Sequence, residues 1–299
     1  MFDRRTAKGP AAMLRDILKK DGINIMPCCF DGISARLIED AGFPFTFMSG
    51  FAVSVARLGL PDAGLISYGE MLDQGMNICS AVKIPVIGDG DTGYGNAVNV
   101  KRTVQGYARA GFASVMIEDQ VWPKRCGHTK GKQVVEREEA FSRIRAAVDA
   151  RDAGPDILIL ARTDALETHG MEEAIERAKG FSDAGADILF VEAPRTREQM
   201  EMIIERTPGI HLANMVEKGL SPLLSPGELE DIGYKIAAYP LTLLSSAMKS
   251  MKQSLELLKQ GRYQPDQMLS FEELKDTAGF NDYYKEEEKY TDLSRYLPS

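Results

Sequence analysis

The feature that most constrains the fold is a short junction that recurs along the chain. Each copy places a glycine just after a predicted helix and an apolar run just after the glycine. The copies are Asp40-Ala41-Gly42 before FPFTFMSG, Arg109-Ala110-Gly111 before FASVMIED, Asp183-Ala184-Gly185 before ADILFVEA and, more weakly, Asp231-Ile232-Gly233 before YKIAAYP. Glycine past a helix end takes the left-handed conformation that a chain reversal needs. Because apolar runs of this length are typical of parallel strands covered on both faces, the junctions predict repeating strand–helix units.

Further units fill the gaps between these junctions. The first three glycines lie roughly 70 residues apart, about two strand–helix units each. Apolar segments near 23–29, 82–88, 157–163 and 210–213 add four strands and bring the total to eight. Helical periodicity is found over 97–110, 136–151, 171–184 and 197–206. Eight alternating units predict an α/β fold, the (β/α)8 TIM barrel, with a doubly wound open sheet as the alternative.

The whole chain, 1–299, is interpreted as a single barrel domain in which 241–299 form a C-terminal helical extension. The segments 241–260 and 270–295 are predicted helices beyond the eight units. Such surplus helices often pack on a neighbouring subunit, so we expect an oligomer.

Composition excludes several classes of protein. A net charge of −8 argues against a nucleic-acid-binding surface, and the basic residues are scattered apart from the segment 124–132. The sequence has no apolar stretch of about 18 residues and no apolar run near its start, which argues against a membrane span and a secretory signal. Four cysteines without a CxxC pair argue against structural zinc or a disulfide framework. We therefore expect a cytoplasmic, reduced protein.

Polar residues follow the predicted strands, where a barrel places its active site. Asp89 and Asp91 end one strand, and Glu118 ends the next. Their hard oxygen ligands suit Mg²⁺, which keeps water or substrate oxygens as its other ligands. The alternative is a turn rich in Asp and Gly that caps the next helix. The same stretch matches GxGxxG, but two carboxylates there would repel a dinucleotide pyrophosphate.

Other strand ends carry groups that could bind an anion. Arg162 could hold a carboxylate bidentately, or it could simply pair with Asp164 or Glu192. The other candidates at strand ends are Ser49-Gly50-Phe51, Glu192 and Asn214. A barrel needs none of these polar residues at its rim for stability, so together they predict a site for a small anionic ligand.

The loop after Glu118 concentrates cations around one thiol. Lys124, Arg125 and His128 flank Cys126 within five positions. We expect these groups to lower the pKa of the thiol and favour the thiolate, which could act as a nucleophile or as an acid/base. The alternative is a chance exposed thiol. We interpret Cys28, Cys29 and Cys79 as packing residues, and His169 and His211 as structural.

These segments resemble the isocitrate lyase/phosphoenolpyruvate mutase superfamily. The resemblance rests on Lys124-Arg125-Cys126-Gly127-His128, Asp89-Gly-Asp91, Glu118-Asp119-Gln120, Ala161-Arg162-Thr163-Asp164 and Leu58-Gly59-Leu60-Pro61-Asp62, and covers about residues 10–290. The KRCGH loop is specific to the carbon–carbon lyase branch. The resemblance implies a (β/α)8 barrel with Mg²⁺ at its site, Mn²⁺ being a substitute. It also implies a homotetramer in which paired subunits exchange the last helix.

The resemblance also implies roles for individual residues. Ser49, Gly50 and Phe51 would bind the carboxylate of a 2-keto acid, and Gly127 and Asn214 would contact substrate. Asp62, Asp89, Asp91 and Glu118 would hold the metal. Cys126 would be the catalytic acid/base, aided by Lys124, His128, Arg162 and Glu192. The 121–133 loop would close over the substrate.

Departures from the family pattern bear on the substrate. In 2-methylisocitrate lyases, arginines stand where this chain has Ser245 and Phe271, and a threonine stands at Val216. Each change removes a partner for an extra carboxylate, which is costly to bury unpaired. Phe47 replaces a tyrosine of some relatives, and Pro240 argues against oxaloacetate hydrolysis. Asn214-Met215-Val216-Glu217 resembles the 2,3-dimethylmalate lyase and petal death protein group.

The resulting expectation is a Mg²⁺-dependent lyase that cleaves a 2-alkylmalate, such as 2,3-dimethylmalate, to pyruvate and a short carboxylic acid. Its substrate would be a small anionic 2-hydroxy dicarboxylate, with no nucleic-acid or membrane partner. The alternatives are a 2-methylisocitrate lyase, which yields pyruvate and succinate, a carboxyphosphonoenolpyruvate phosphonomutase, and a non-catalytic metabolite-binding barrel.

Overall fold

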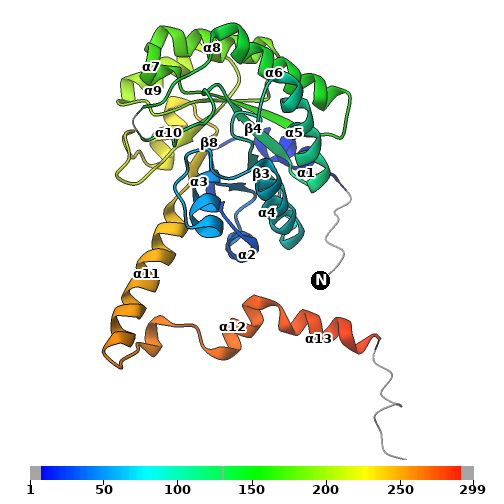
Figure 1. Ribbon diagram of the computed structural model, residues 1–299, viewed down its shortest axis with the longest axis vertical. Coiled ribbons are helices and arrows are strands. Elements are labelled where there is room, and N and C mark those ends of the chain that lie inside the picture. The colour runs from blue at the N-terminus through cyan, green and yellow to red at the C-terminus, as the bar shows by residue number, and fades with distance from the viewer. Residues whose placement is uncertain (1–7, 130, 291–299) are drawn as a thin grey trace, which may run out of the picture. The chain divides into compact units, whose positions relative to one another are not determined.

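Eight parallel strands close into a barrel in the computed structural model, which describes residues 8–129 and 131–290. Figure 1 shows the strands at the centre of the barrel with helices around them. The strands are β1 (Asn24–Cys29), β2 (Thr46–Met48), β3 (Val86–Asp89), β4 (Ser114–Glu118), β5 (Leu158–Thr163), β6 (Ile188–Val191), β7 (Ile210–Asn214) and β8 (Ile236–Tyr239). Asn24 of β1 pairs with Ile236 of β8, which closes the barrel. The predicted (β/α)8 fold is confirmed, and an open sheet is excluded.

Both faces of the barrel wall are covered. All six residues of β5 are buried. Leu158 and Leu160 belong to one apolar cluster, whereas Ile159 and Ala161 belong to another. Because successive side chains of a strand point to opposite faces, one cluster fills the barrel and the other lies between sheet and helices. This arrangement explains the continuous apolar runs in the sequence.

The predicted junction glycines end helices. Gly42, Gly111, Gly185 and Gly233 have positive φ angles, of 85°, 98°, 99° and 112° respectively. A side chain is strained in this conformation, so glycine is favoured at each reversal. The helices are α1 (Pro10–Leu18), α2 (Gly32–Asp40), α3 (Gly50–Val53), α4 (Tyr68–Ala81), α5 (Ala97–Ala110), α6 (Arg137–Asp152), α7 (Ala165–His169), α8 (Met171–Asp183), α9 (Arg197–Arg206) and α10 (Pro226–Ile232), with a π-helix, η1 (Ser54–Leu58).

The barrel unit ends at Ser245, and the segment from Ser246 belongs to a separate compact unit. Helix α11 (Thr242–Lys259) crosses this boundary, and η2 (Pro265–Gln267), α12 (Phe271–Ala278) and α13 (Phe280–Glu288) follow it. The tail predicted as helical over 270–295 is thus two helices separated at Gly279, and its residues 291–295 lie outside the described ranges. Many apolar side chains here are exposed, among them Met251, Leu255, Leu258, Phe271 and Tyr284.

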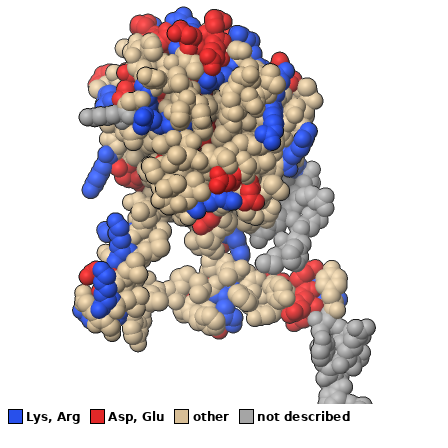
Figure 2. All heavy atoms as spheres, viewed as in Figure 1, with Lys and Arg blue, Asp and Glu red and all other residues tan. Residues whose placement is uncertain are grey.

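The surface carries charges of both signs. Figure 2 shows Lys and Arg side chains interspersed with Asp and Glu over the face of the barrel in view. Across 8–129 and 131–290, no helix combines the length and apolarity needed to cross a membrane.

Candidate active site

A pocket lies at the carboxyl ends of the barrel strands, and residues of the segment 124–128 border it. Every strand contributes to its wall. The bordering residues that the sequence predicted are Ser49, Phe51, Asp62, Asp89, Lys124, Cys126, Gly127, His128, Arg162, Glu192 and Asn214. The other predicted residues lie one contact behind the wall: Gly50 contacts Asp89, Asp91 contacts Lys124, and Glu118 contacts Arg162. One barrel rim therefore gathers the whole predicted set.

The end of β3 is held by backbone groups. Gly50 N–H donates to Asp89 Oδ2 at 3.1 Å, and Asp91 N–H donates to Asp89 Oδ1 at 3.0 Å. A Cβ on Gly50 would lie 2.4 Å from Asp89 Oδ2, so only glycine allows this approach. The hydroxyl of Tyr107 donates to the Asp89 carbonyl at 2.7 Å. These contacts fix the Asp89 carboxylate beside the pocket.

Lys124 lies between two buried carboxylates. Its Nζ is 2.6 Å from Asp62 Oδ1 and 2.7 Å from Asp91 Oδ1. Burial alone would lower the pKa of Lys124, but Asp91, Asp62 and Asp89 outweigh this effect and raise it well above its ordinary value. For Asp91, burial raises the pKa to about 7, with Asp89 and Asp62 adding to the rise and Lys124 opposing it. Asp91 also has a left-handed φ of 48°, uncommon for a residue with a side chain.

The acidic residues suit a hard cation in their chemistry. Asp91 Oδ2 and Glu118 Oε1 are buried without a hydrogen-bond partner, and Mg²⁺ favours such carboxylate oxygens. No group of three or more His, Cys, Asp or Glu in the described part of the chain is arranged as a metal site. In this arrangement the Lys124 ammonium supplies the positive charge between Asp62 and Asp91. The donor set fits a metal, and the assignment of Asp62, Asp89, Asp91 and Glu118 as its ligands stays a prediction.

Arg162 of β5 pairs with three carboxylates. Its Nε lies 2.8 Å from Asp164 Oδ2 and 3.3 Å from Glu118 Oε2, and its Nη2 lies 3.1 Å from Glu192 Oε2. The sequence left open whether Arg162 holds a ligand carboxylate or pairs within the protein. In this structure Arg162 pairs within the protein. Burial would raise the pKa of Glu192, but Arg162 and His128 outweigh burial and lower it, so Glu192 stays ionised. Asn214 Nδ2 is 3.3 Å from Glu192 Oε2.

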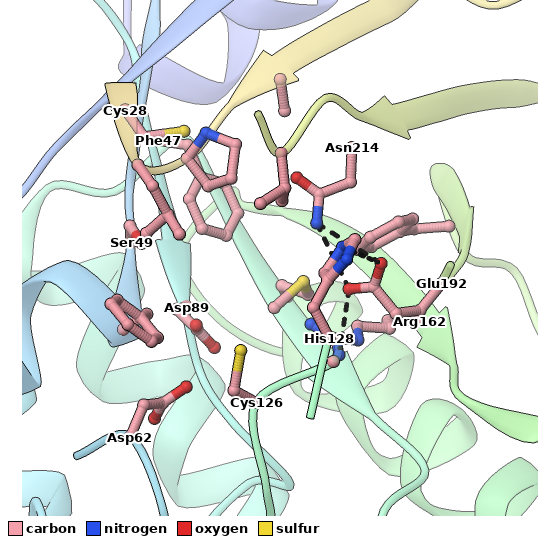
Figure 3. A pocket seen from close by; sticks show the side chains of 18 of the residues that line it. Cys28, Phe47, Ser49, Asp62, Asp89, Cys126, His128, Arg162, Glu192 and Asn214 are labelled. Atoms are coloured by element: carbon pink, nitrogen blue, oxygen red, sulfur yellow. Dashed lines mark hydrogen bonds and ion pairs between the residues drawn. The ribbon is translucent and has the colours of Figure 1, made fainter. Parts of the chain in front are cut away.

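The segment 126–128 lies close against this charged group. A Cβ on Gly127 would be 2.4 Å from Glu192 Oε2 and 2.5 Å from Arg162 Nη2, so a larger residue would push the loop away. Leu220 N–H donates to His128 Nδ1 at 3.0 Å, which leaves the ring proton on Nε2. That Nε2 lies 3.3 Å from Glu192 Oε1 (Figure 3).

Cys126 borders the pocket, and its sulfur points toward the space beside Asp89 (Figure 3). Burial raises the pKa of its thiol, and Asp62 and Glu192 raise it further. The expectation of a lowered pKa is therefore wrong, because burial of the thiol outweighs the effect of the neighbouring cations. The Lys124 ammonium is also paired with Asp62 and Asp91. A protonated thiol is suited to donating a proton.

The pocket also has an apolar wall that the sequence interpretation did not assemble. The apolar residues that border it are Cys28, Phe47, Met116, Phe190, Leu212, Val216, Ala238, Pro240 and Leu241. Cys28 is buried, as expected, yet it also faces the pocket. Alternation along the strands could have identified these positions, since residues facing the barrel interior near a strand end reach the site. Of the positions that distinguish the substrate, Val216 borders the pocket, Ser245 is exposed, and Phe271 belongs to the C-terminal unit.

Residues 14–259 match the family described as phosphoenolpyruvate phosphomutase. A 2,3-dimethylmalate lyase of Eubacterium barkeri is 43% identical over 94% of this chain and 98% of its own length. A 2-methylisocitrate lyase of Aeropyrum pernix is 38% identical over 94% of this chain and 91% of its own.

Solved structures show the same relationship. A crystal structure of 2,3-dimethylmalate lyase, described as a member of the PEP mutase/isocitrate lyase superfamily, is 36% identical with a TM-score of 0.91, covering 96% of this chain and 97% of that one. A phosphonopyruvate hydrolase in complex with oxalate and Mg²⁺ is 27% identical with a TM-score of 0.84, covering 95% of this chain and 99% of that one.

Proposed function

The chain belongs to the phosphoenolpyruvate mutase/isocitrate lyase superfamily, and from this premise we propose that it is a carbon–carbon lyase acting on a 2-alkylmalate. The substrate would be a compound such as 2,3-dimethylmalate, and the products pyruvate and a short carboxylic acid. The observation that carries the proposal is the position of Cys126, which borders the same pocket as Asp89, Arg162 and Glu192. Burial raises the pKa of its thiol, which favours the form that can donate a proton.

The reaction requires a proton donor and a cationic pocket. A base must first take the proton of the 2-hydroxyl group. The oxygen then becomes the keto group of the first product as the C2–C3 bond breaks, and the electron pair of that bond stays on C3, delocalised into the carboxylate attached to C3. Cys126 would give its proton to C3, a general-acid step. Arg162, with the His128 Nε2–H beside it, would stabilise the negative charge that develops on this carboxylate. Glu192 would hold both donors in place.

The other half of the substrate would remain near the ends of β2 and β3. Ser49, Gly50 and Phe51 would bind the carboxylate of the keto acid, with Asp89 close by. Asp62, Asp89, Asp91 and Glu118 would hold Mg²⁺, in keeping with the Mg²⁺ complex of the related hydrolase. When bound, Mg²⁺ would supply positive charge that stabilises the developing anions.

The apolar wall favours a 2-alkylmalate over a tricarboxylate. Val216, Pro240 and Leu241 offer no donor to a third carboxylate, and leaving such a group unpaired in a buried site is costly. The similarity to a 2-methylisocitrate lyase makes that activity the second candidate. Steady-state kinetics with 2,3-dimethylmalate and 2-methylisocitrate, followed by pyruvate release, tests the choice. A clear preference for the tricarboxylate would reverse it.

We also propose that the protein assembles as a homotetramer whose paired subunits exchange their C-terminal helices. An apolar groove on the barrel unit supports this, lined by Ile25, Pro27, Leu37, Ile38, Ala41, Phe43, Tyr239, Thr242 and Leu243. The exposed apolar residues of α11 to α13 are suited to burial against another chain. Light scattering should give roughly four times the 33.0 kDa chain mass, and a monomer at micromolar concentration would refute the assembly.

A further inference from the structure

Lys132 is a buried cation with all its hydrogen-bonding capacity in use. Its side chain is 0% exposed. Its Nζ lies 2.6 Å from the Gly127 carbonyl oxygen, 3.0 Å from Asp164 Oδ1 and 2.8 Å from Glu167 Oε2. An ammonium group has three N–H donors, so these acceptors match its capacity. Lys132 thereby connects the loop over the pocket to the end of β5.

Asp164 is the fixed point of this connection. Its Oδ2 accepts from Arg162 Nε at 2.8 Å, while its Oδ1 accepts from both Arg162 Nη2 and Lys132 Nζ at 3.0 Å. Its backbone N–H donates to Asp119 Oδ1 at 2.9 Å. Asp119 is in turn paired with the buried Arg177 at 3.0 Å. One rigidly held carboxylate thus joins the pocket cation Arg162 to the loop cation Lys132.

Gly127 is where this connection acts on the site. Its carbonyl accepts from Lys132, and its Cα lies so close to Glu192 and Arg162 that no side chain fits. The Gly127 peptide lies between Cys126 and His128, so its orientation decides where both side chains point. An unfastened Gly127 carbonyl would leave this peptide free to turn.

We propose that Lys132 is a positioning residue: it fastens the segment 126–128 to Asp164 and so sets the position of the Cys126 thiol over the pocket. The catalytic consequence rests on the proposed function, whereas the fastening itself does not. Proton transfer to carbon requires the donor within hydrogen-bond reach of its target. A small shift of the loop would therefore lower turnover more than it lowers substrate binding.

The charge state of Lys132 agrees with this role. Burial would lower its pKa, but Asp164 and the hydrogen bond to Glu167 outweigh burial and raise it. The ammonium is therefore present throughout the physiological pH range, and the connection does not depend on pH there.

Lys132→Met tests the proposal, because methionine keeps an unbranched side chain of similar length without the charge. Lys179→Met on α8 is the matched control, since Lys179 is 42% exposed and pairs only with Glu176 among the ion pairs of the described residues. Two measurements report on the loop without requiring turnover. One is the alkylation rate of Cys126 by iodoacetamide, resolved from Cys79 by peptide mapping. The other is acrylamide quenching of Trp122, the only tryptophan in the sequence.

In Lys132→Met we expect Cys126 alkylation to accelerate roughly tenfold, the size of one lost charge-assisted hydrogen bond. Trp122 should be quenched more readily, and kcat should fall by a similar factor with little change in KM. The control variant should match the wild type in all of these. A folded Lys132→Met with wild-type alkylation and quenching would overturn the proposal, whatever its kcat.

A second variant covers the case in which Lys132→Met does not fold. Glu167→Gln removes one charge at the 27% exposed edge of the contact, and should accelerate alkylation by roughly threefold. Wild-type alkylation in this variant would then overturn the proposal. If the wild-type protein turned over none of the malates tested, the proposed lyase function would be rejected. Faster alkylation of Cys126 in Lys132→Met would still support the positioning role in that case.

Discussion

The two halves of the pocket differ in kind. The half formed by the ends of β3 to β6 and the segment 124–128 carries charge, with Asp89, Lys124, Arg162 and Glu192 all largely buried. The half formed by β7, β8, β1 and β2 is mainly apolar, with Phe47, Leu212, Val216, Pro240 and Leu241. Charged groups are needed to break a bond next to carboxylates whatever alkyl group the substrate carries. The comparison therefore separates residues that perform the reaction from residues that select the substrate.

The largest effect should come from the proton donor of the charged half. Cys126→Ser replaces the thiol with a much weaker acid, so kcat should fall on the order of a thousandfold. Binding of oxalate in the presence of Mg²⁺, measured by calorimetry, should change little. Cys79→Ser, at a thiol outside the pocket, should keep wild-type kcat. Near-normal turnover in Cys126→Ser would remove the thiol from the reaction.

Removing the Lys124 charge should destabilise the charged half and reveal its affinity for a cation. Lys124→Met leaves Asp62 and Asp91 buried without their partner, which should cost roughly 3 kcal/mol of unfolding free energy. A bound divalent cation would replace the missing charge, so Mg²⁺ should stabilise this variant more than the wild type. Urea unfolding with and without MgCl2 measures both effects. Equal stabilisation of both proteins by Mg²⁺ would argue against a metal at these carboxylates.

A change in the apolar half should alter preference rather than turnover. Val216→Thr adds a hydroxyl to the apolar wall, which should shift the ratio of kcat/KM for 2,3-dimethylmalate over 2-methylisocitrate by roughly tenfold toward the tricarboxylate. Val98→Thr, at an exposed position on α5, is the matched control. If Val216→Thr lowered kcat for both substrates equally, the division between reaction and selection would fail at this residue.

The sequence predicted the barrel well because its signals are local. A glycine after a helix and an apolar run after the glycine are each visible within a dozen residues. The charged half of the pocket could be predicted once the barrel fold was predicted, because polar residues at the strand ends of a barrel meet at one rim. The pairing of Lys124 with Asp62 and Asp91 depends on the path of a loop, which no local pattern specifies.

Other features of the site depend on burial, which the sequence shows only indirectly. The sign of the Cys126 pKa shift was wrong because desolvation outweighs the neighbouring cations. The apolar wall was anticipated only at Phe47, Val216 and Pro240, because residues such as Leu212 and Ala238 look like ordinary core residues of a strand. Lys132 entered the sequence analysis only as the last residue of the basic segment 124–132, whereas its three acceptors come from two separate segments.

The smallest predicted effect concerns the ion pairs that support the charged half from outside. Arg177 holds Asp119, and Glu173 holds Arg177 at 2.7 Å. Hydrogen bonds from Arg137 and Arg177 outweigh burial and lower the pKa of Glu173 to about 2. A carboxylate whose pKa is lower in the folded state than in the unfolded state stabilises the protein at pH values above its unfolded-state pKa, which is about 4.3 for Glu. This stabilisation is lost as the pH falls from there toward 2.

Glu173→Gln should therefore lower the unfolding free energy by about 1 kcal/mol near pH 7, allowing for solvent screening of a partly exposed pair. The difference between variant and wild type should shrink below pH 4 and vanish near pH 2, which urea unfolding across this range would show. Glu176→Gln, at an exposed position on the same helix, should show no such pH dependence. If the difference in unfolding free energy between Glu173→Gln and the wild type stayed constant from pH 7 to pH 2, packing and not charge would account for the contribution of Glu173.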